Sequence, residues 1–180
     1  MRFLENYTKI VLYAYPFLLT VGKDYEEHIR NRAVLSFGSS MNAEKLVEYI
    51  AEEILRKERL EWLKGAVERV LAKLSDAERT LIAIRYFGRK RKIRAYRYTK
   101  AAKERENANG RGWSERMYFR HQQRLGNKVS GLLKLEGLTE DVYERDFKDE
   151  ETFAKIHAFV EAGRDKGISV NEREWLHIKP

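Results

Sequence analysis

Apolar residues recur at the spacing of an α-helix along much of this chain. The longest such tract runs from residue 42 to 74, where an apolar stripe persists for about nine turns and charged residues fill the opposite face. The other tracts predicted to be helical are residues 3–21, 24–35, 76–87, 98–106, 114–135 and 150–163. Only two prolines occur, Pro16 and Pro180, and Pro16 is expected to kink or divide the first tract. This pattern predicts an all-α fold: a helical scaffold with one long helix plus a helix-turn-helix module.

Polar residues that cap helices mark several of the expected boundaries. Ser75 and Glu78 have the spacing of a capping box, in which each side chain accepts a hydrogen bond from the other residue's backbone N–H. Asp24 and Ser114 are predicted to begin two further helices. Turns are expected at residues 36–40 and 107–112, which are rich in glycine, serine and asparagine.

Changes in composition divide the chain into three segments. Residues 1–74 are predicted to form an N-terminal helical scaffold, in which the first tract covers the apolar stripe of the long helix; a coiled-coil dimer is the alternative. Residues 75–136 form a basic, helix-turn-helix-like module. Residues 137–180 form an acidic helical tail, in which seven carboxylates between Thr139 and Glu151 face only two basic residues.

Positive charge is concentrated in one part of the sequence. Between Arg85 and Lys128, fifteen Lys and Arg residues stand against three carboxylates, a net charge of +12, whereas the whole chain carries +8. The rest of the chain therefore sums to −4. A basic segment interleaved with Tyr, Phe and Trp is typical of a nucleic-acid contact. The alternative is a solvated basic face.

Other classes of protein are disfavoured by composition. Cysteine is absent, which excludes disulfides and fits a reducing, cytoplasmic location. The apolar run from residue 10 to 21 has about half the length that a membrane span needs, and no cleavage site of a signal peptide follows it, so no membrane association is expected. The histidines lack the spacing of metal ligands, and no nucleophile–histidine arrangement occurs. We therefore expect no enzyme, no cofactor and no metal site; the four histidines are His28, His121, His157 and His177.

The basic module resembles region 4 of sigma factors and related helix-turn-helix regulators, including phage-type transcriptional activators. The likeness covers roughly residues 70–135 and is carried by Leu74-Ser75, Glu78-Arg79, Leu81-Ile82, Arg85-Tyr86-Phe87, Ser114, Arg116, Met117 and the basic helix to Lys128. The segment from Phe87 to Ser114 is longer than in such proteins, and Lys100-Ala101-Ala102 stands where they have Glu-Ile-Ala. Two interpretations are open: a loop that grips phosphate, which we favour, or a motif that has become a packing unit.

The resemblance implies that the helix after Ser114 enters the major groove of double-stranded DNA. Arginine suits guanine, and glutamate suits cytosine. The predicted base contacts are Glu115, Arg116, Phe119, Arg120, Gln123 and Arg124. The predicted phosphate contacts are Arg89, Lys90, Arg91, Lys92, Arg94, Arg97, Ser114 and Lys128.

The expected function is therefore a DNA-binding transcription regulator. The resemblance further implies a contact with RNA polymerase. The acidic tail has three candidate roles: this contact, an interface between copies of the chain, or a lid over the basic face. Two alternative functions remain: a phage-type DNA-packaging or structural subunit, which would form a homo-oligomer, and a non-catalytic protein-interaction scaffold. The target sequence and the regulated process do not follow from the sequence.

Overall fold

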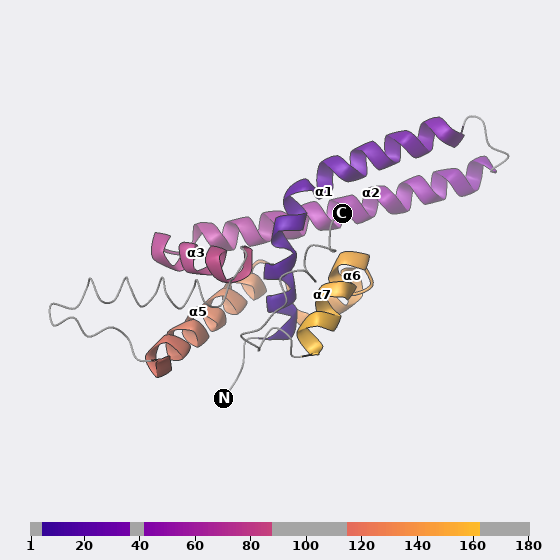
Figure 1. Ribbon diagram of the computed structural model, residues 1–180. Coiled ribbons are helices and arrows are strands. Elements are labelled where there is room, and N and C mark those ends of the chain that lie inside the picture. The colour runs from indigo at the N-terminus through magenta and orange to yellow at the C-terminus, as the bar shows by residue number, and fades with distance from the viewer. Residues whose placement is uncertain (1–4, 37–41, 88–114, 163–180) are drawn as a thin grey trace.

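The computed structural model describes residues 5–36, 42–87 and 115–162, and every regular element in that part of the chain is helical (Figure 1). The predicted all-α class is confirmed. In chain order the elements are α1 (Asn6–Ser36), α2 (Ala43–Ala72), α3 (Asp76–Ile82), the π-helical turn η1 (Ala83–Phe87), α5 (Glu115–Leu135), α6 (Glu140–Asp146) and α7 (Glu151–Glu161).

The first half of α1 is the centre of the molecule. All eight residues from Tyr7 to Ala14 are buried, which requires neighbours on every side because one face of a helix holds only about half of its residues. Figure 1 shows this half of α1 crossing the middle of the fold, with α3 and α5 on one side and α6 and α7 on the other.

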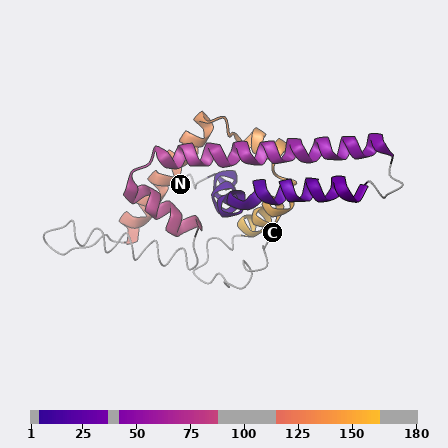
Figure 2. The same ribbon diagram turned by 90° about the horizontal axis from the view of Figure 1, so that it is seen from above.

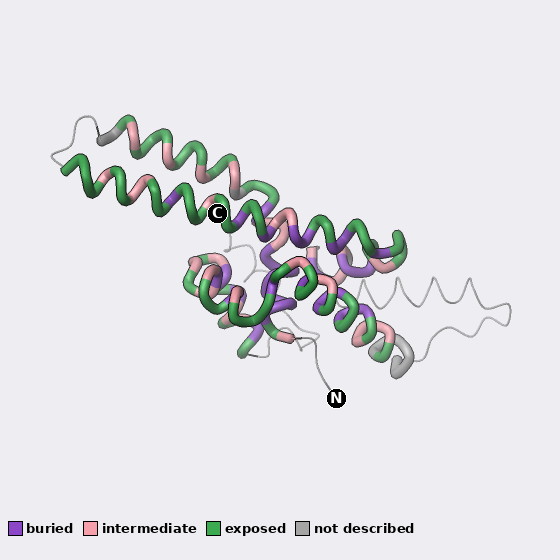
Figure 3. Tube along the Cα trace, turned by 180° about the vertical axis from the view of Figure 1, so that it is seen from behind, coloured by how far each residue is buried: buried purple, intermediate pink, exposed green. Residues whose placement is uncertain are grey.

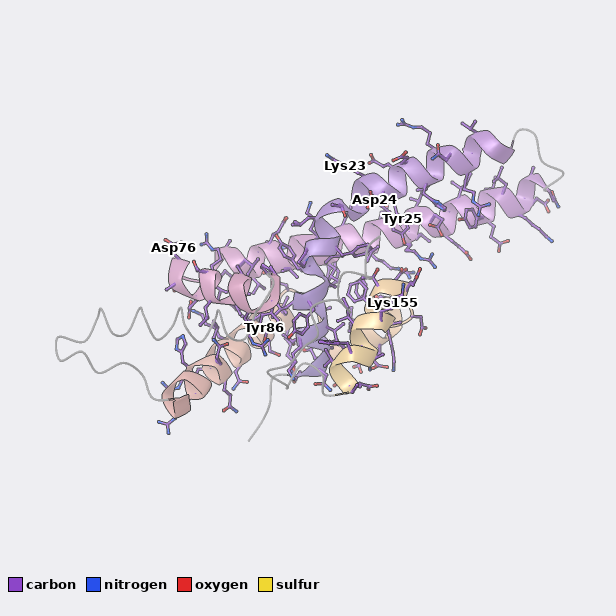
Figure 4. All side chains as sticks on the ribbon, viewed as in Figure 1. Lys23, Asp24, Tyr25, Asp76, Tyr86 and Lys155 are labelled. Carbon is purple, nitrogen blue, oxygen red and sulfur yellow. The ribbon has the colours of Figure 1, made fainter. Side chains whose placement is uncertain are left out.

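The two N-terminal helices predicted from the sequence are one helix. Pro16 lies inside α1 and does not end it; the helix bends in its middle (Figures 1 and 2), as the absent N–H of Pro16 allows. The prediction that Asp24 caps a second helix is wrong, because Asp24 lies within the continuous helix (Figure 4). A single Gly22 before it is too weak a break, since a helical glycine costs only about 1 kcal/mol.

The second half of α1 and the first half of α2 form a two-helix hairpin that projects from the rest of the fold (Figures 1 and 3). We call residues 23–36 and 43–58 the arm, and the remaining described residues the body. α2 begins as predicted, with the Asn42 side chain accepting a hydrogen bond from the Glu44 N–H at 3.2 Å. Where the arm meets the body, Arg56 pairs with Glu53 at 3.0 Å and with Glu150 at 2.6 Å.

The apolar stripe of α2 is buried only in the body. Leu60, Leu63 and Val67 are fully buried, as predicted. Leu46 and Ile50 are half-buried, and Ile54, which continues the apolar stripe at the same spacing of four residues, is 42% exposed. The periodicity is the same in both halves, but the arm offers α2 one partner helix where the body offers several.

The body has one hydrophobic core, to which all three predicted segments contribute. Its largest side chains include Ile10 from α1, Leu63 from α2, Leu133 from α5 and Phe153 from α7. Helix α6 was not predicted from the sequence; it begins where the Thr139 side chain accepts from the Val142 N–H at 3.3 Å. α6 and the turn after it bury the rings of Tyr143 and Phe147, so the acidic tail enters the core from residue 138 to 160.

Candidate nucleic-acid interface

The predicted capping box positions α3 and also joins it to α5. The Ser75 N–H donates to Glu78 Oε2 at 2.9 Å, and the Glu78 N–H donates to Ser75 Oγ at 3.3 Å, so both halves of the box are formed. The same carboxylate accepts from Lys128 Nζ of α5 at 2.9 and 2.7 Å. Hydrogen bonding to Lys128, above all, lowers the pKa of Glu78.

The next residue, Arg79, fixes α3 to the end of α2. Its guanidinium donates to the Leu71 carbonyl oxygen at 3.2 Å and to the Leu74 carbonyl oxygen at 3.3 Å, in the turn where α2 ends. The Glu78-Arg79 pair of the sequence pattern therefore holds α3 between α5 and α2.

The Arg85-Tyr86-Phe87 motif attaches the turn η1 to the aromatic side of α1. Arg85 Nη1 donates to the Tyr13 hydroxyl at 3.1 Å, and the Tyr86 ring meets the Tyr13 ring edge-on, with 5.1 Å between centroids. Phe87 packs on Tyr15 at 4.9 Å. These residues, which carry part of the resemblance, connect the basic module to the scaffold.

Helix α5 has one apolar side and one basic side. Leu125, Val129 and Leu133 are buried in the core at intervals of one turn. Arg120 and Arg124 also lie one turn apart, on the opposite side, and both are exposed. Within the described residues, no acidic side chain forms an ion pair with either arginine.

The second half of α5 is fixed to three other helices. Besides the Lys128 pair with Glu78, Lys134 Nζ donates to Glu5 at 2.8 Å, and Glu5 also accepts from Ser130 at 2.7 Å. At the end of the helix Glu136 accepts from Arg69 at 2.6 Å and from Lys73 at 2.5 Å. Figure 1 shows the first half of α5 extending away from the other helices of the body. The C-terminal end of α5 is therefore fixed, while its N-terminal half projects outward.

Of the other predicted base contacts, the structure describes the side chain of Gln123 alone. Gln123 is half-buried. Glu115, Arg116 and Phe119 lie in the first two turns of α5, and their side chains fall outside the described residues. Arg116 precedes Arg120 by four residues, which places it on the same side of the helix.

Most of the predicted phosphate contacts also fall outside the described residues. They are Arg89, Lys90, Arg91, Lys92, Arg94, Arg97 and Ser114. Lys128 is described, and its ion pair with Glu78 was not predicted. No spacing rule could have found that pair, because the two residues are separated by 50 positions.

Within residues 5–36, 42–87 and 115–162, no cluster of three or more His, Cys, Asp or Glu side chains has a geometry that could hold a metal ion. In the same residues, no helix combines the length and apolar character needed to cross a membrane.

Comparison of this chain with protein-family models, with curated proteins and with solved structures finds no match.

Proposed function

We propose that this chain binds double-stranded DNA through the exposed side of α5 and acts as a transcription regulator. The observation that supports this most directly is the exposed pair Arg120 and Arg124, which lies opposite the buried side of α5 and near its outward-reaching half. Such a helix has the width that the major groove admits.

The spacing of the two arginines suits successive positions on a duplex. Four residues of α-helix advance about 6 Å, and base pairs are stacked about 3.4 Å apart. Arg120 and Arg124 would therefore reach bases about two steps apart, each with a guanidinium able to bind guanine O6 and N7. Arg116 would extend the row by one more turn.

Affinity would come mainly from the basic segment before α5. Residues 85–128 carry a net charge of +12, and cations that contact phosphates release counterions, so binding would weaken steeply with salt. By the resemblance to sigma region 4, the protein would contact RNA polymerase, and the absence of cysteine fits action in the cytoplasm. A DNA-packaging subunit would use the same helix, and the assembly of a ring in solution would favour it over a regulator.

The test measures sequence preference and general affinity separately. Sequences bound by the full chain are first selected from a random duplex pool, and fluorescence anisotropy then compares the selected duplex with a scrambled one over a series of salt concentrations. Arg120→Ala and Arg124→Ala should each reduce the preference by about 1–3 kcal/mol, while Arg91→Ala should weaken both duplexes alike.

Arg145→Ala is the matched control, since Arg145 is an exposed arginine of α6, and α6 lies across α1 from α5 (Figure 1). It should change neither affinity nor preference. Absence of binding to any duplex at low salt would overturn the proposal. An equal loss on both duplexes for Arg120→Ala and Arg124→Ala would remove α5 as the reading helix.

A further inference from the structure

Gly131 lies inside α5 at a position where nothing in the described part of the fold requires a glycine. Its φ is not in the positive range, which among the described glycines occurs at Gly137 alone. A Cβ atom added at Gly131 would have no described neighbour within 4 Å, whereas one added at Gly65 would lie 3.1 Å from Arg69. Glycine is among the least favourable residues inside a helix. An exposed helical glycine of this kind suits a ligand that approaches the helix backbone closely.

Gly131 lies on the same side of α5 as the two arginines of the proposed DNA contact. It follows Arg124 by seven residues and Arg120 by eleven, and both spacings are close to whole numbers of helical turns. Asn127, between Arg124 and Gly131, is also exposed. Exposed positions recur along the described part of α5 (Figure 3). The arginine side of the helix therefore continues as a polar row to Gly131.

Two lysines flank Gly131 at equal distances along the helix. Lys128 precedes it and Lys134 follows it, each by three residues, so the three positions form a ridge with a gap at its centre. The Lys128 side chain is 45% exposed and pairs with Glu78 at 2.7 Å; the Lys134 side chain is 48% exposed and pairs with Glu5 at 2.8 Å. Because an ammonium group has three N–H donors, each lysine can bind a further anion without leaving its carboxylate.

The charge of α5 selects an anion as the ligand at this gap. Residues 116–135 carry five Lys and Arg residues and no carboxylate. The carboxylates that pair with the lysines of α5, Glu5 and Glu78, come from outside the helix, and five cations less these two still leave a net charge of +3. The last residue of α5, Leu135, is apolar and 81% exposed, so the polar row ends beside Lys134.

We propose that α5 leaves the major groove at Gly131 and that a phosphate of the DNA backbone lies against this residue, between Lys128 and Lys134. The inference rests on the proposed function and adds the place where the helix crosses the DNA backbone. The midpoint of Arg120 and Arg124 is about 13.5 Å from Gly131 along the axis. The centre of the major groove is only about 6 Å from its edge, so a helix centred on the two arginines reaches the edge before Gly131.

The first experiment fills the gap with a side chain. Fluorescence anisotropy measures binding of the full chain to the selected and the scrambled duplex over a series of salt concentrations. Gly131→Leu should raise Kd on both duplexes at least about tenfold, because the new side chain takes the place of the phosphate. It should also reduce the slope of log Kd against log salt concentration by about 0.9–1.8, since one or two lysine–phosphate contacts are lost.

Ala154→Leu is the matched control, because it adds a similar side chain at an exposed position of α7, which lies across α1 from α5 (Figure 1). It should change neither Kd nor the salt dependence. Gly131→Ala adds only a methyl group and should weaken binding less, while the free chain becomes more resistant to urea. A glycine with a purely structural role would not combine higher stability with weaker binding. Circular dichroism shows that each variant is folded.

The second experiment locates the end of α5 on the duplex. The sequence contains no cysteine, so Leu135→Cys, one turn beyond Gly131, can carry a single iron–EDTA group that cuts nearby deoxyribose. The cuts should fall at one edge of the bases whose preference depends on Arg120 and Arg124. Ala154→Cys with the same label should not cut above background. Cuts in the middle of those bases would mean that α5 is still in the groove at Gly131, which would overturn the inference.

The outcomes of the binding experiment separate this inference from the proposed function. If Gly131→Leu binds both duplexes as the wild type does, with the same salt dependence, no phosphate lies at Gly131 and the inference fails, while base reading by Arg120 and Arg124 stands or falls on its own test. A loss confined to the selected duplex would place a base at Gly131 and would also overturn the inference. Absence of wild-type binding to any duplex at low salt would overturn the proposed function itself.

Discussion

Glu78 offers the sharpest test of how the basic module is held together, because one carboxylate serves two helices. It accepts from the Ser75 N–H at the start of α3 and from Lys128 of α5. Glu78→Ala removes both interactions. Glu78→Gln keeps an oxygen for the Ser75 N–H but loses the charge that attracts Lys128.

The free-energy cost of Glu78→Ala is the sum of two lost interactions, the helix cap and the Lys128 ion pair. A capping interaction contributes about 0.5–1.5 kcal/mol. The Lys128 side chain is 45% exposed, and solvent screening limits a pair of that kind to about 0.2–1 kcal/mol. We expect Glu78→Ala to lower the free energy of unfolding by about 1–2 kcal/mol and Glu78→Gln by roughly half as much. For a chain of this size, 1 kcal/mol corresponds to a change in Tm of about 2–4 °C.

Urea denaturation followed by circular dichroism at 222 nm measures these differences. A double-mutant cycle with Lys128→Ala isolates the ion pair: the cost of Lys128→Ala should shrink in the Glu78→Ala background. If that cost is the same in both backgrounds, the pair contributes nothing and α5 is held by its apolar contacts alone.

The pH dependence adds a further check on the same residue. The pKa of Glu78 is lowered in the folded chain, so its ionised form favours folding above the ordinary pKa of about 4.5 and this contribution disappears as the pH falls through the lowered value. The difference in stability between the wild type and Glu78→Gln should therefore be full at pH 7 and narrow towards pH 3. A difference that stays constant with pH would refute the reasoning.

Three other predictions concern the body. Leu133 is fully buried and Leu135 is 81% exposed, so Leu133→Ala should cost about 2–5 kcal/mol and Leu135→Ala less than about 0.5 kcal/mol in urea denaturation. Gly137 has φ +93°, which an L side chain rarely adopts, so Gly137→Ala should destabilise the fold by about 1 kcal/mol. Gly131 lies in a helix with open space around a new methyl group, so Gly131→Ala should stabilise it by about 0.5–1 kcal/mol. Thermal melts compare the two variants. Hydrogen bonds from Lys73 and then Arg69 lower the pKa of Glu136, so protonation of Glu136 below about pH 4.5 destabilises the wild type. Glu136→Gln lacks this group and should lose less stability on acidification than the wild type, as measured by acid titration of the helical signal.

Local signals in the sequence were enough to predict the start of α3 and the extent of α5. The capping box at Ser75 and the extent of α5, predicted as residues 114–135 and observed as Glu115–Leu135, both depend on residues a few positions apart. The same kind of signal failed at Asp24, because a residue that can cap a helix can equally lie on the exposed side of one. It also missed α6, whose seven residues are too few to show a period.

Features that depend on distant residues could not be predicted. The pairs Glu5–Lys134 and Glu78–Lys128 join residues 129 and 50 positions apart, and no pattern in the sequence relates them. The exposure of Ile54 was missed for a related reason: a stripe of apolar residues shows which side of a helix is apolar, but the number of helices that cover it is set by the whole fold. The base and phosphate contacts stay predictions.

The burial of Tyr7 to Ala14 on all sides has a consequence for the order in which this chain folds. The groups that enclose these residues, such as Val129 and Phe153, are synthesised more than a hundred positions later. Until then the first half of α1 exposes apolar side chains on its whole circumference, and the native contacts that finally enclose it close long loops, which slows folding. A nascent chain of this protein is therefore expected to depend on chaperones until the ribosome has completed the segment that contains α7.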